Sequence, residues 1–528
     1  MTLLHISMKT DTASFKAHIE KGYTFKKDFI VLGTAMLNGE PVPSTHIKVP
    51  LKTLNRHGLI AGATGTGKTK TLQVIAEQLS CKGIPSLLMD LKGDLSGLAQ
   101  PGSLNDHIVW RQGQIGIPYV AEPMPVELLT ISDEPGVRMR ATISEFGPVL
   151  LAKILNLNDT QEGVLAMIFK YCDDNKMPLL DLNDMKSVLK YSKDEGKEEF
   201  EKEYGMVSSS SIGTIQRKII ALEQQGAEKF FGERSFDVED LTKVTRDGKG
   251  IVSIMRLTDI QDKPKLFSTF MLSLLAEVYS TFEEQGDSDQ PRLCIFIDEA
   301  HLVFKEASSA LLDQIEAIVK LIRSKGVGIF FCTQNPTDVP DAVLGQLGLK
   351  VQHALRAFTA KDRKAINKTA ENYPISPFYE TDQILTQLGI GEALVTALNE
   401  KGIPTPLAAT LLQAPKTRMD ILTKKEIKDI VSKSDMARFY NEEIDRDSAF
   451  EILKEKVERA SKKEHKAELQ RQKDAGDKEV KSSRSSRKKE KSFIEKASQN
   501  TMVRQVGRTI FRELARGILG ALGVKNRR

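Results

Sequence analysis

Short apolar runs alternate with helical patterns along most of the first 415 residues. The apolar runs have the length and composition of buried β-strands, and they lie at 58–62, 85–90, 250–257, 292–298 and 326–333. Between them, apolar residues recur with helical spacing at 69–83, 265–284 and 309–326. Strands that alternate with helices predict right-handed crossovers and a mainly parallel sheet covered on both faces.

The pattern changes in several places, and these changes predict the domain boundaries. Residues 1–50 are predicted to form a short N-terminal β segment, because residues 21–56 contain short apolar runs separated by turn residues. Helical spacing without strand runs predicts a helical insertion at 148–245. The α/β core therefore comprises 51–147 and 246–415, and 390–412 at its end have the pattern of a β-hairpin.

The C-terminal part differs from the body in composition and in charge. Residues 416–500 are rich in Lys and Glu and are predicted to be a charged linker, part helical and part disordered. Residues 451–528 hold 23 Lys and Arg against 11 Asp and Glu, whereas the preceding residues hold 53 against 60. A basic tail on a mildly acidic body indicates an anionic partner, either nucleic acid or membrane.

Residues 501–528 are predicted to form a basic amphipathic helix. Apolar residues share one face and arginines recur every four residues on the other: Val503, Val506, Ile510, Leu514 and Ile518 against Arg504, Arg508, Arg512 and Arg516. Three interpretations stay open, namely peripheral contact with an anionic membrane, packing on a partner helix, and binding of nucleic-acid phosphates.

The chain has neither the start of a signal peptide nor an apolar run of the roughly 18 residues needed to cross a bilayer. Its four cysteines are far apart and form no metal-binding pair. These features predict a cytoplasmic protein from a reducing compartment.

The sequence GATGTGKTK, which follows the first apolar run, has the spacing of a phosphate-binding loop. Its glycines allow backbone N–H groups to approach phosphate oxygens, and the next helix directs its positive end at the anion. Lys68 is predicted to reach the β- and γ-phosphates, and Thr69 to bind Mg²⁺. The predicted nucleotide-binding residues are Gly62, Ala63, Thr64, Gly65, Thr66, Gly67, Lys68, Thr69 and Lys70.

A second motif, LCIFIDEAH, supplies the carboxylates that such a loop needs. Asp298 ends an apolar strand and is predicted to hold Mg²⁺ through water. Glu299 is the predicted general base that polarises the attacking water. Gln334 ends the next strand, where it could contact the γ-phosphate.

Other charged residues are weaker candidates. Asp90 and Asp94 flank Lys92 at the carboxyl end of a predicted strand, where open α/β sheets place ligands, although a charged turn is an equally good interpretation. An arginine that compensates charge on the γ-phosphate could be Arg323, Arg356 or Arg363, and any single one could instead be an ordinary surface arginine.

Several long stretches together resemble the HerA/FtsK superfamily of P-loop ATPases, and more narrowly the bacterial HerA-like helicase branch typified by YjgR. They include HGLIAGATGTGKT, LMDLKGDLSGLA, FIDEAHLVF, LIRSKGVGIFFCTQNPTDVPDAVLGQLG and IGEALVTALNEKGIP. The resemblance extends from about residue 25 to 415.

The resemblance implies a RecA-like ATPase core that uses ATP and Mg²⁺, with Lys68, Thr69, Asp298, Glu299 and Gln334 in the roles given above. It places Arg356 and Arg323 near a subunit interface. Relatives act as hexameric DNA translocases, often with a nuclease partner, which predicts a ring-forming DNA translocase or helicase. Two alternatives stay open: a protein-remodelling or secretion-type ATPase of the same superfamily, and a nucleotide-gated binding module with little turnover.

Overall fold

A computed structural model describes residues 11–286, 288–305, 309–357, 359–442, 444, 447–462 and 466–467. The chain divides into two units, Met1–Lys454 and Glu455–Arg528, and the description below concerns the first. The disordered stretch expected at 474–491 and the amphipathic helix expected at 501–528 lie outside the described residues.

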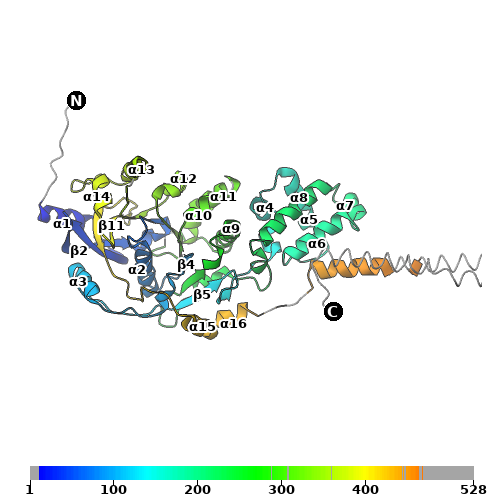
Figure 1. Cartoon of the computed structure of the whole chain (residues 1–528), viewed down its shortest axis with the longest axis horizontal. Coiled ribbons are helices and arrows are strands. Elements are labelled where there is room, and N and C mark those ends of the chain that lie inside the picture. Colours follow the sequence, from blue (N-terminus) through cyan, green and yellow to red (C-terminus); the bar gives the residue numbers. More distant parts are fainter. Residues whose placement is uncertain are drawn as a thin grey trace, which may run out of the picture. The chain divides into compact units, whose positions relative to one another are not determined.

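The centre of the first unit is one mixed sheet (Figure 1). Its strand order is β2-β1-β12-β11-β10-β3-β9-β8-β4-β7-β5-β6, and the strands from β10 to β6 in this order are parallel. The parallel strands are β3 (Gly58–Ala61), β4 (Ser86–Asp90), β5 (Val126–Thr130), β6 (Val137–Arg138), β7 (Val252–Arg256), β8 (Leu293–Ile297), β9 (Val327–Thr333) and β10 (Leu349–His353). The mainly parallel α/β fold predicted from the sequence is therefore confirmed.

The strands of the parallel part are apolar because they are covered on both sides. Every residue of β3, β4, β8 and β9 is buried, as expected for a parallel sheet between two layers of helices. All five predicted apolar runs are strands here, whereas β5, β6 and β10 were not predicted.

The other end of the sheet is antiparallel and joins the two ends of the core sequence. It consists of β1 (Phe29–Leu37), β2 (Glu40–Pro50), β11 (Glu392–Thr396) and β12 (Ala408–Leu412). β11 and β12 pair as the expected hairpin, and β1 pairs with both β2 and β12. The N-terminal strands thus extend the main sheet, and they follow a helix that the sequence pattern did not reveal, α1 (Thr12–Gly22), whose N-cap is Asp11.

Helices lie on both sides of the sheet in Figure 1, with α10 to α12 towards the top of the view and α2 and α15 towards the bottom. The helices of the core are α2 (Lys68–Cys81), α3 (Asp106–Ile115), α9 (Pro264–Thr281), α10 (His301–Lys305), α11 (Ser309–Leu321), α12 (Asp341–Leu344), α13 (Ala360–Ala370) and α14 (Thr381–Gln387). The helices predicted at 69–83, 265–284 and 309–326 correspond to α2, α9 and α11.

Between β6 and β7 the chain forms a group of helices. They are α4 (Ile143–Ile154), α5 (Asp159–Asp174), α6 (Leu182–Lys193), α7 (Lys197–Glu203) and α8 (Ser209–Glu223). Capping boxes at Thr142, Asn158 and Asp181 begin α4, α5 and α6, and each satisfies two backbone groups at a helix start. The rings of Tyr171 and Phe200, with centroids 4.3 Å apart and a 35° tilt, form part of the interior of this group.

Residues that follow the predicted core boundary at 415 pack on the core. The segment 416–422, which we call the strap, runs along α2 and is followed by α15 (Lys424–Lys433) and α16 (Asp435–Tyr440). α15 contacts β5 and α16 contacts β6. The charged linker expected from residue 416 therefore begins with a part that belongs to the body of the protein.

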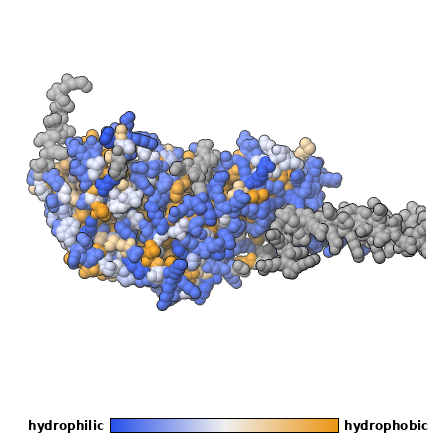
Figure 2. All heavy atoms as spheres, in the orientation of Figure 1, coloured by the Kyte–Doolittle hydropathy of each residue, from blue (hydrophilic) through white to orange (hydrophobic). Residues whose placement is uncertain are grey.

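The surface visible in Figure 2 is mainly hydrophilic, with hydrophobic residues in small separate groups. Among the described residues, no helix combines the length and the apolar character needed to cross a membrane.

Candidate nucleotide site

The loop between β3 and α2 has the backbone of a phosphate-binding loop. Gly67 is the N-cap of α2 and adopts φ 110°, and Gly62 adopts φ 150°. A Cβ atom at Gly62 would lie 2.5 Å from the Cβ of His353, so only glycine fits there. The first N–H groups of α2 have no partner within the helix, and they lie where the predicted phosphates would be bound.

Lys68 lies at the first position of α2 and is buried. Its ammonium donates to the carbonyl oxygens of Gly62 at 2.7 Å and Ala63 at 3.2 Å. Burial lowers the pKa of Lys68, and the nearby carboxylate of Glu299 acts in the opposite direction. The effect of the Glu299 charge on Lys68 is consistent with a loop and an acidic strand that face the same space.

Strand register explains why these residues meet. β9 lies between β3 and β8, with Ala61 opposite Thr333 and Ile297 opposite Phe331. Neighbouring strands are about 4.8 Å apart. The phosphate loop, Gln334 and the acidic pair therefore leave the sheet side by side at one carboxyl edge, the place where open α/β sheets bind ligands.

Asp298 has the properties of a magnesium ligand. It is 5% exposed, and its Oδ2 accepts no hydrogen bond from any described residue. Burial, followed by the charge of Glu299, raises the pKa of Asp298 to about 6. A nearby cation would remove both the missing contact and the electrostatic cost, because carboxylate and hydroxyl oxygens suit Mg²⁺. The half-buried Thr69, next to Lys68, would supply the hydroxyl.

Glu299 follows Asp298 in a left-handed backbone conformation, with φ 46°. Its side chain is 6% exposed and forms an ion pair with Lys92, and its Oε2 lies 3.2 Å from Nδ1 of His301. Lys92 comes from the loop after β4, the strand next to β8. Burial acts to lower the pKa of Lys92, but the contact with Glu299 and the charges of Glu299, Asp298 and Asp94 together outweigh it, and the pKa is raised.

Gln334 lines a cavity of about 550 Å³. The lining also includes His301, Phe304, Leu312, Asn335, Thr337, Asp338 and Pro340. Gln334 follows β9 directly, so it is placed at the carboxyl edge where a phosphate sensor would lie.

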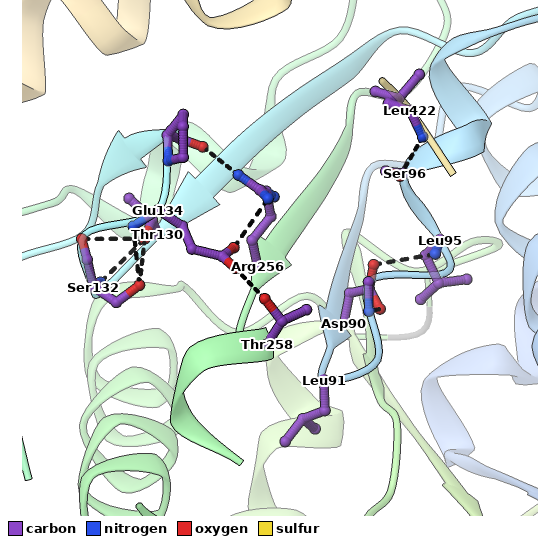
Figure 3. A network of polar contacts seen from close by, with 12 residues as sticks. Asp90, Leu91, Leu95, Ser96, Thr130, Ser132, Glu134, Arg256, Thr258 and Leu422 are labelled. Carbon is purple, nitrogen blue, oxygen red and sulfur yellow. Dashed lines mark hydrogen bonds and ion pairs between the residues drawn. The ribbon is translucent and has the colours of Figure 1, made fainter. Parts of the chain in front are cut away.

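Asp90 has a structural role in the loop that follows β4. The carboxylate of Asp90 accepts from the backbone N–H groups of Gly93, Asp94 and Leu95 at 2.7 to 3.2 Å, and Figure 3 shows it turned towards Leu95. Burial raises the pKa of Asp90 to about 7. Asp90 therefore shapes the loop that carries Lys92, which supports the interpretation of a charged turn.

At the ends of β5 and β7, a separate polar network holds Arg256. Its guanidinium pairs with Glu134 at 3.2 Å and donates to the carbonyl of Pro135 at 2.9 Å, and Glu134 also contacts Thr258 (Figure 3). Arg256 is thus committed to a structural ion pair.

Lys70, predicted as part of the nucleotide-binding loop, makes a contact within the protein. Its ammonium donates to the carbonyl of Met419 in the strap at 2.6 Å. Two further residues of α2, Gln73 and Glu77, also bind the strap: Gln73 donates to Arg418 O at 2.9 Å, and Glu77 accepts from the amides of Lys416 and Thr417 at 2.9 Å. The strap therefore fixes the helix that follows the phosphate loop.

The three candidate arginines take no part in the contacts described above. Arg356 is exposed in the loop after β10, and Arg363 is exposed on α13. Arg323 is exposed just after α11. Their exposure is compatible with contact to a neighbouring subunit, and it does not distinguish between them.

The structure adds three residues that sequence reasoning missed. His353 ends β10, is buried, and pairs through Nε2 with the hydroxyl of Thr71 on α2 at 2.9 Å. Gly391 donates to Thr66 O at 3.0 Å, and Arg111 binds the carbonyl of Gly391 at 3.0 Å. The one available signal was a pair of polar residues, Gln352 and His353, at the end of a strand-like run.

Comparisons with known proteins identify helicases among the relatives of this chain. The DNA double-strand break repair helicase HerA of Sulfolobus acidocaldarius is 21% identical over 370 residues, which cover 69% of this chain and 66% of that protein. A protein named as a probable helicase from Methanocaldococcus jannaschii is 24% identical over 404 residues, covering 69% and 67%. The chain thus spans about two thirds of the length of these relatives.

Solved structures are more distant. The bacterial conjugative coupling protein TrwB is 14% identical, with a TM-score of 0.49 over 77% of this chain and 94% of that chain. VirB4 of Thermoanaerobacter pseudethanolicus is 15% identical, with a TM-score of 0.47 over 74% and 98%.

The family model of the C-terminal region of HerA-like helicases matches residues 35–527, nearly the whole chain. With the phosphate loop and the acidic strand at one edge of a parallel sheet, this match confirms the resemblance found in the sequence, and the chain belongs to the HerA-like helicase family.

Proposed function

We propose that this protein is an ATP-hydrolysing motor that acts on DNA as an oligomeric ring. One observation carries the proposal: strand register brings the phosphate loop, Gln334 and the acidic pair to the same carboxyl edge. Family membership and the name of the HerA relative support DNA as the substrate.

Each residue of the site has a role that follows from its position. Lys68 would bind the β- and γ-phosphates, and Thr69 and Asp298 would hold Mg²⁺. A bound magnesium–ATP complex supplies the phosphoanhydride bond that is cleaved. Glu299 would orient the attacking water and accept its proton, and Gln334 would contact the γ-phosphate from the strand between.

The ring, its partners and its location are further parts of the proposal. A hexamer would allow the exposed Arg356 to reach the γ-phosphate of a neighbouring subunit. The basic tail would add salt-sensitive phosphate contacts. A nuclease or other protein partner, a peripheral membrane contact of 501–528 and the cytoplasmic location stay predictions.

The test is phosphate release by the intact chain with no DNA, single-stranded DNA and duplex DNA, together with its mass in solution by light scattering. We expect DNA to raise the turnover and high salt to remove this effect. Binding of basic residues to DNA phosphates releases counterions, so the affinity for DNA falls as the salt concentration rises. Glu299→Gln should lower kcat by about 100-fold or more, since a positioned general base contributes about 10²–10⁴.

The matched control is Glu198→Gln, an exposed glutamate on α7 that should leave turnover unchanged. A turnover that DNA does not change would exclude DNA as the substrate. A Glu299→Gln variant with wild-type turnover would exclude the site itself.

A further inference from the structure

Lys92 and Glu299 are brought together by two neighbouring parallel strands. β4 and β8 pair with Met89 opposite Ile297, so the loops that carry Lys92 and Glu299 leave the sheet side by side. The ammonium of Lys92 forms an ion pair with Oε1 of Glu299. Lys92 has no role of its own in the proposed hydrolysis.

The ion pair occupies the carboxylate that has to act on water. One oxygen of Glu299 contacts Lys92, and the other lies 3.2 Å from Nδ1 of His301. With its side chain 6% exposed, Glu299 has little other access to solvent. A general base needs an oxygen within hydrogen-bond reach of the water that it polarises. In this arrangement Lys92 occupies one of the two carboxylate oxygens, and the other faces His301.

The backbone and the side chain of Lys92 differ in how freely they can move. Asp90 fixes the backbone of the Lys92 loop through three amide hydrogen bonds. The lysine side chain itself is 40% exposed at the carboxyl edge of the sheet. A lysine ammonium at the end of a flexible four-carbon stem can exchange partners without a change in the backbone.

We propose that Lys92 is a positioning residue that holds Glu299 away from the attacking water. When a phosphate of the polyanionic substrate binds the ammonium of Lys92, the ion pair breaks and Glu299 is released. This inference rests on the proposed function, because it takes nucleic acid as the polyanion. Release of Glu299 would then couple ATP hydrolysis to substrate binding without any contact between the substrate and the nucleotide.

The test compares Lys92→Ala, Lys92→Gln and Lys92→Arg in the full chain. For each variant, kcat and KM for ATP are measured with and without single-stranded DNA, and the Kd of a fluorescent ATP analogue is measured separately. Lys229→Ala is the matched control, because Lys229 is 42% exposed and pairs with Asp133 at 3.2 Å on another part of the surface.

We expect Lys92→Ala and Lys92→Gln to raise kcat without DNA about fivefold, the factor that corresponds to a partly exposed ion pair at the upper end of the measured range. Stimulation by DNA should shrink by the same factor, while the Kd of the analogue stays unchanged. Lys92→Arg should keep a low basal rate, since it retains the cation, and Lys229→Ala should match the wild type.

A basal kcat that falls or stays unchanged in both neutral variants would overturn the inference. A raised KM or Kd with unchanged kcat would also overturn it, because Lys92 would then bind the nucleotide directly. If the wild type does not respond to DNA but the neutral variants still gain basal turnover, the hold on Glu299 stands and only the choice of DNA as substrate fails.

Discussion

The two walls of the candidate site are built in different ways. The phosphate-loop wall is held by backbone groups of distant segments: Gly391 N donates to Thr66 O, and carbonyl oxygens of the strap accept from the side chains of Lys70 and Gln73. The acidic wall depends on a contact between two charged side chains, Lys92 and Glu299. An ammonium on a flexible stem can exchange partners more easily than a backbone carbonyl can move. We therefore expect the wall that binds phosphates to be the more rigid one, and the acidic wall to be the one that changes its contacts.

The largest effect should come from the phosphate-loop wall. We expect Lys68→Ala to lower kcat for ATP hydrolysis by about 10³-fold, because removal of one preorganised charge-stabilising donor costs about 10²–10³ in rate. Phosphate release measures it. Lys70→Ala is the internal comparison: its ammonium binds Met419 O, so this variant should keep most of its turnover. Equal losses in both variants would contradict the assigned contacts.

The acidic wall should respond to the metal concentration. Asp298→Asn should raise the Mg²⁺ concentration for half-maximal turnover by about 10–100-fold, the range seen when residues that support a metal site are changed. A Mg²⁺ titration of ATP hydrolysis measures the shift. Asp90→Asn serves as the control, because its carboxylate binds backbone amides. An unchanged Mg²⁺ requirement in Asp298→Asn would remove the metal role.

The strap should contribute to stability. Glu77→Ala leaves the amides of Lys416 and Thr417 without their acceptor, and unsatisfied buried donors cost about 1–3 kcal/mol. Thermal unfolding should show a melting temperature several degrees below that of the wild type. Glu198→Ala, on an exposed position of α7, should not change it. A wild-type melting temperature for Glu77→Ala would show that the strap is dispensable.

The smallest effect concerns pH and the start of the phosphate-loop strand. His57 is buried, accepts from Ile329 N at 3.0 Å and contacts Val319 O at 2.8 Å. Burial lowers its pKa to about 4, and the charge of Arg323 acts in the same direction. His57 therefore adds stability that is fully present above its unfolded pKa of about 6.5 and is lost as the pH falls towards 4.

Between pH 7 and pH 6 the loss at His57 should be about 1 kcal/mol or less. Melting temperatures measured across this interval should fall, and His57→Gln should flatten the dependence while lowering stability at pH 7. His353 has a similarly lowered pKa of about 4 and will contribute part of the slope. An identical slope in the wild type and His57→Gln would exclude His57 as a source.

The sequence predicted the parts of the site that depend on neighbouring residues. The phosphate loop and the Asp298–Glu299 pair are each short motifs at the end of an apolar run, so spacing alone reveals them. Whether the two motifs share one site depends on strand order. The resemblance to a family implied that they do, because apolar runs alone do not specify which strands pair.

The contacts that the sequence did not reveal join distant segments. Thr71 and His353 are 282 positions apart, and Glu77 and Thr417 are 340 apart. Similarly, β1 and β2 were expected as strands, but their pairing with β12 follows only from the fold. Polar residues such as Gln73 and Glu77 gave no sign of their partners, because a helix surface in water has the same composition.

The strap also has a consequence for the order of synthesis. The lysine that it binds, Lys70, precedes Met419 by 349 positions. At roughly 5–20 residues per second, a ribosome needs about 17–70 s to add them. During that interval α2 can be complete while its polar face still lacks its partners. The phosphate loop is thus synthesised early, but the contacts that hold its helix form only after the strap has been made. A nascent chain released before residue 420 would carry the phosphate loop without these contacts.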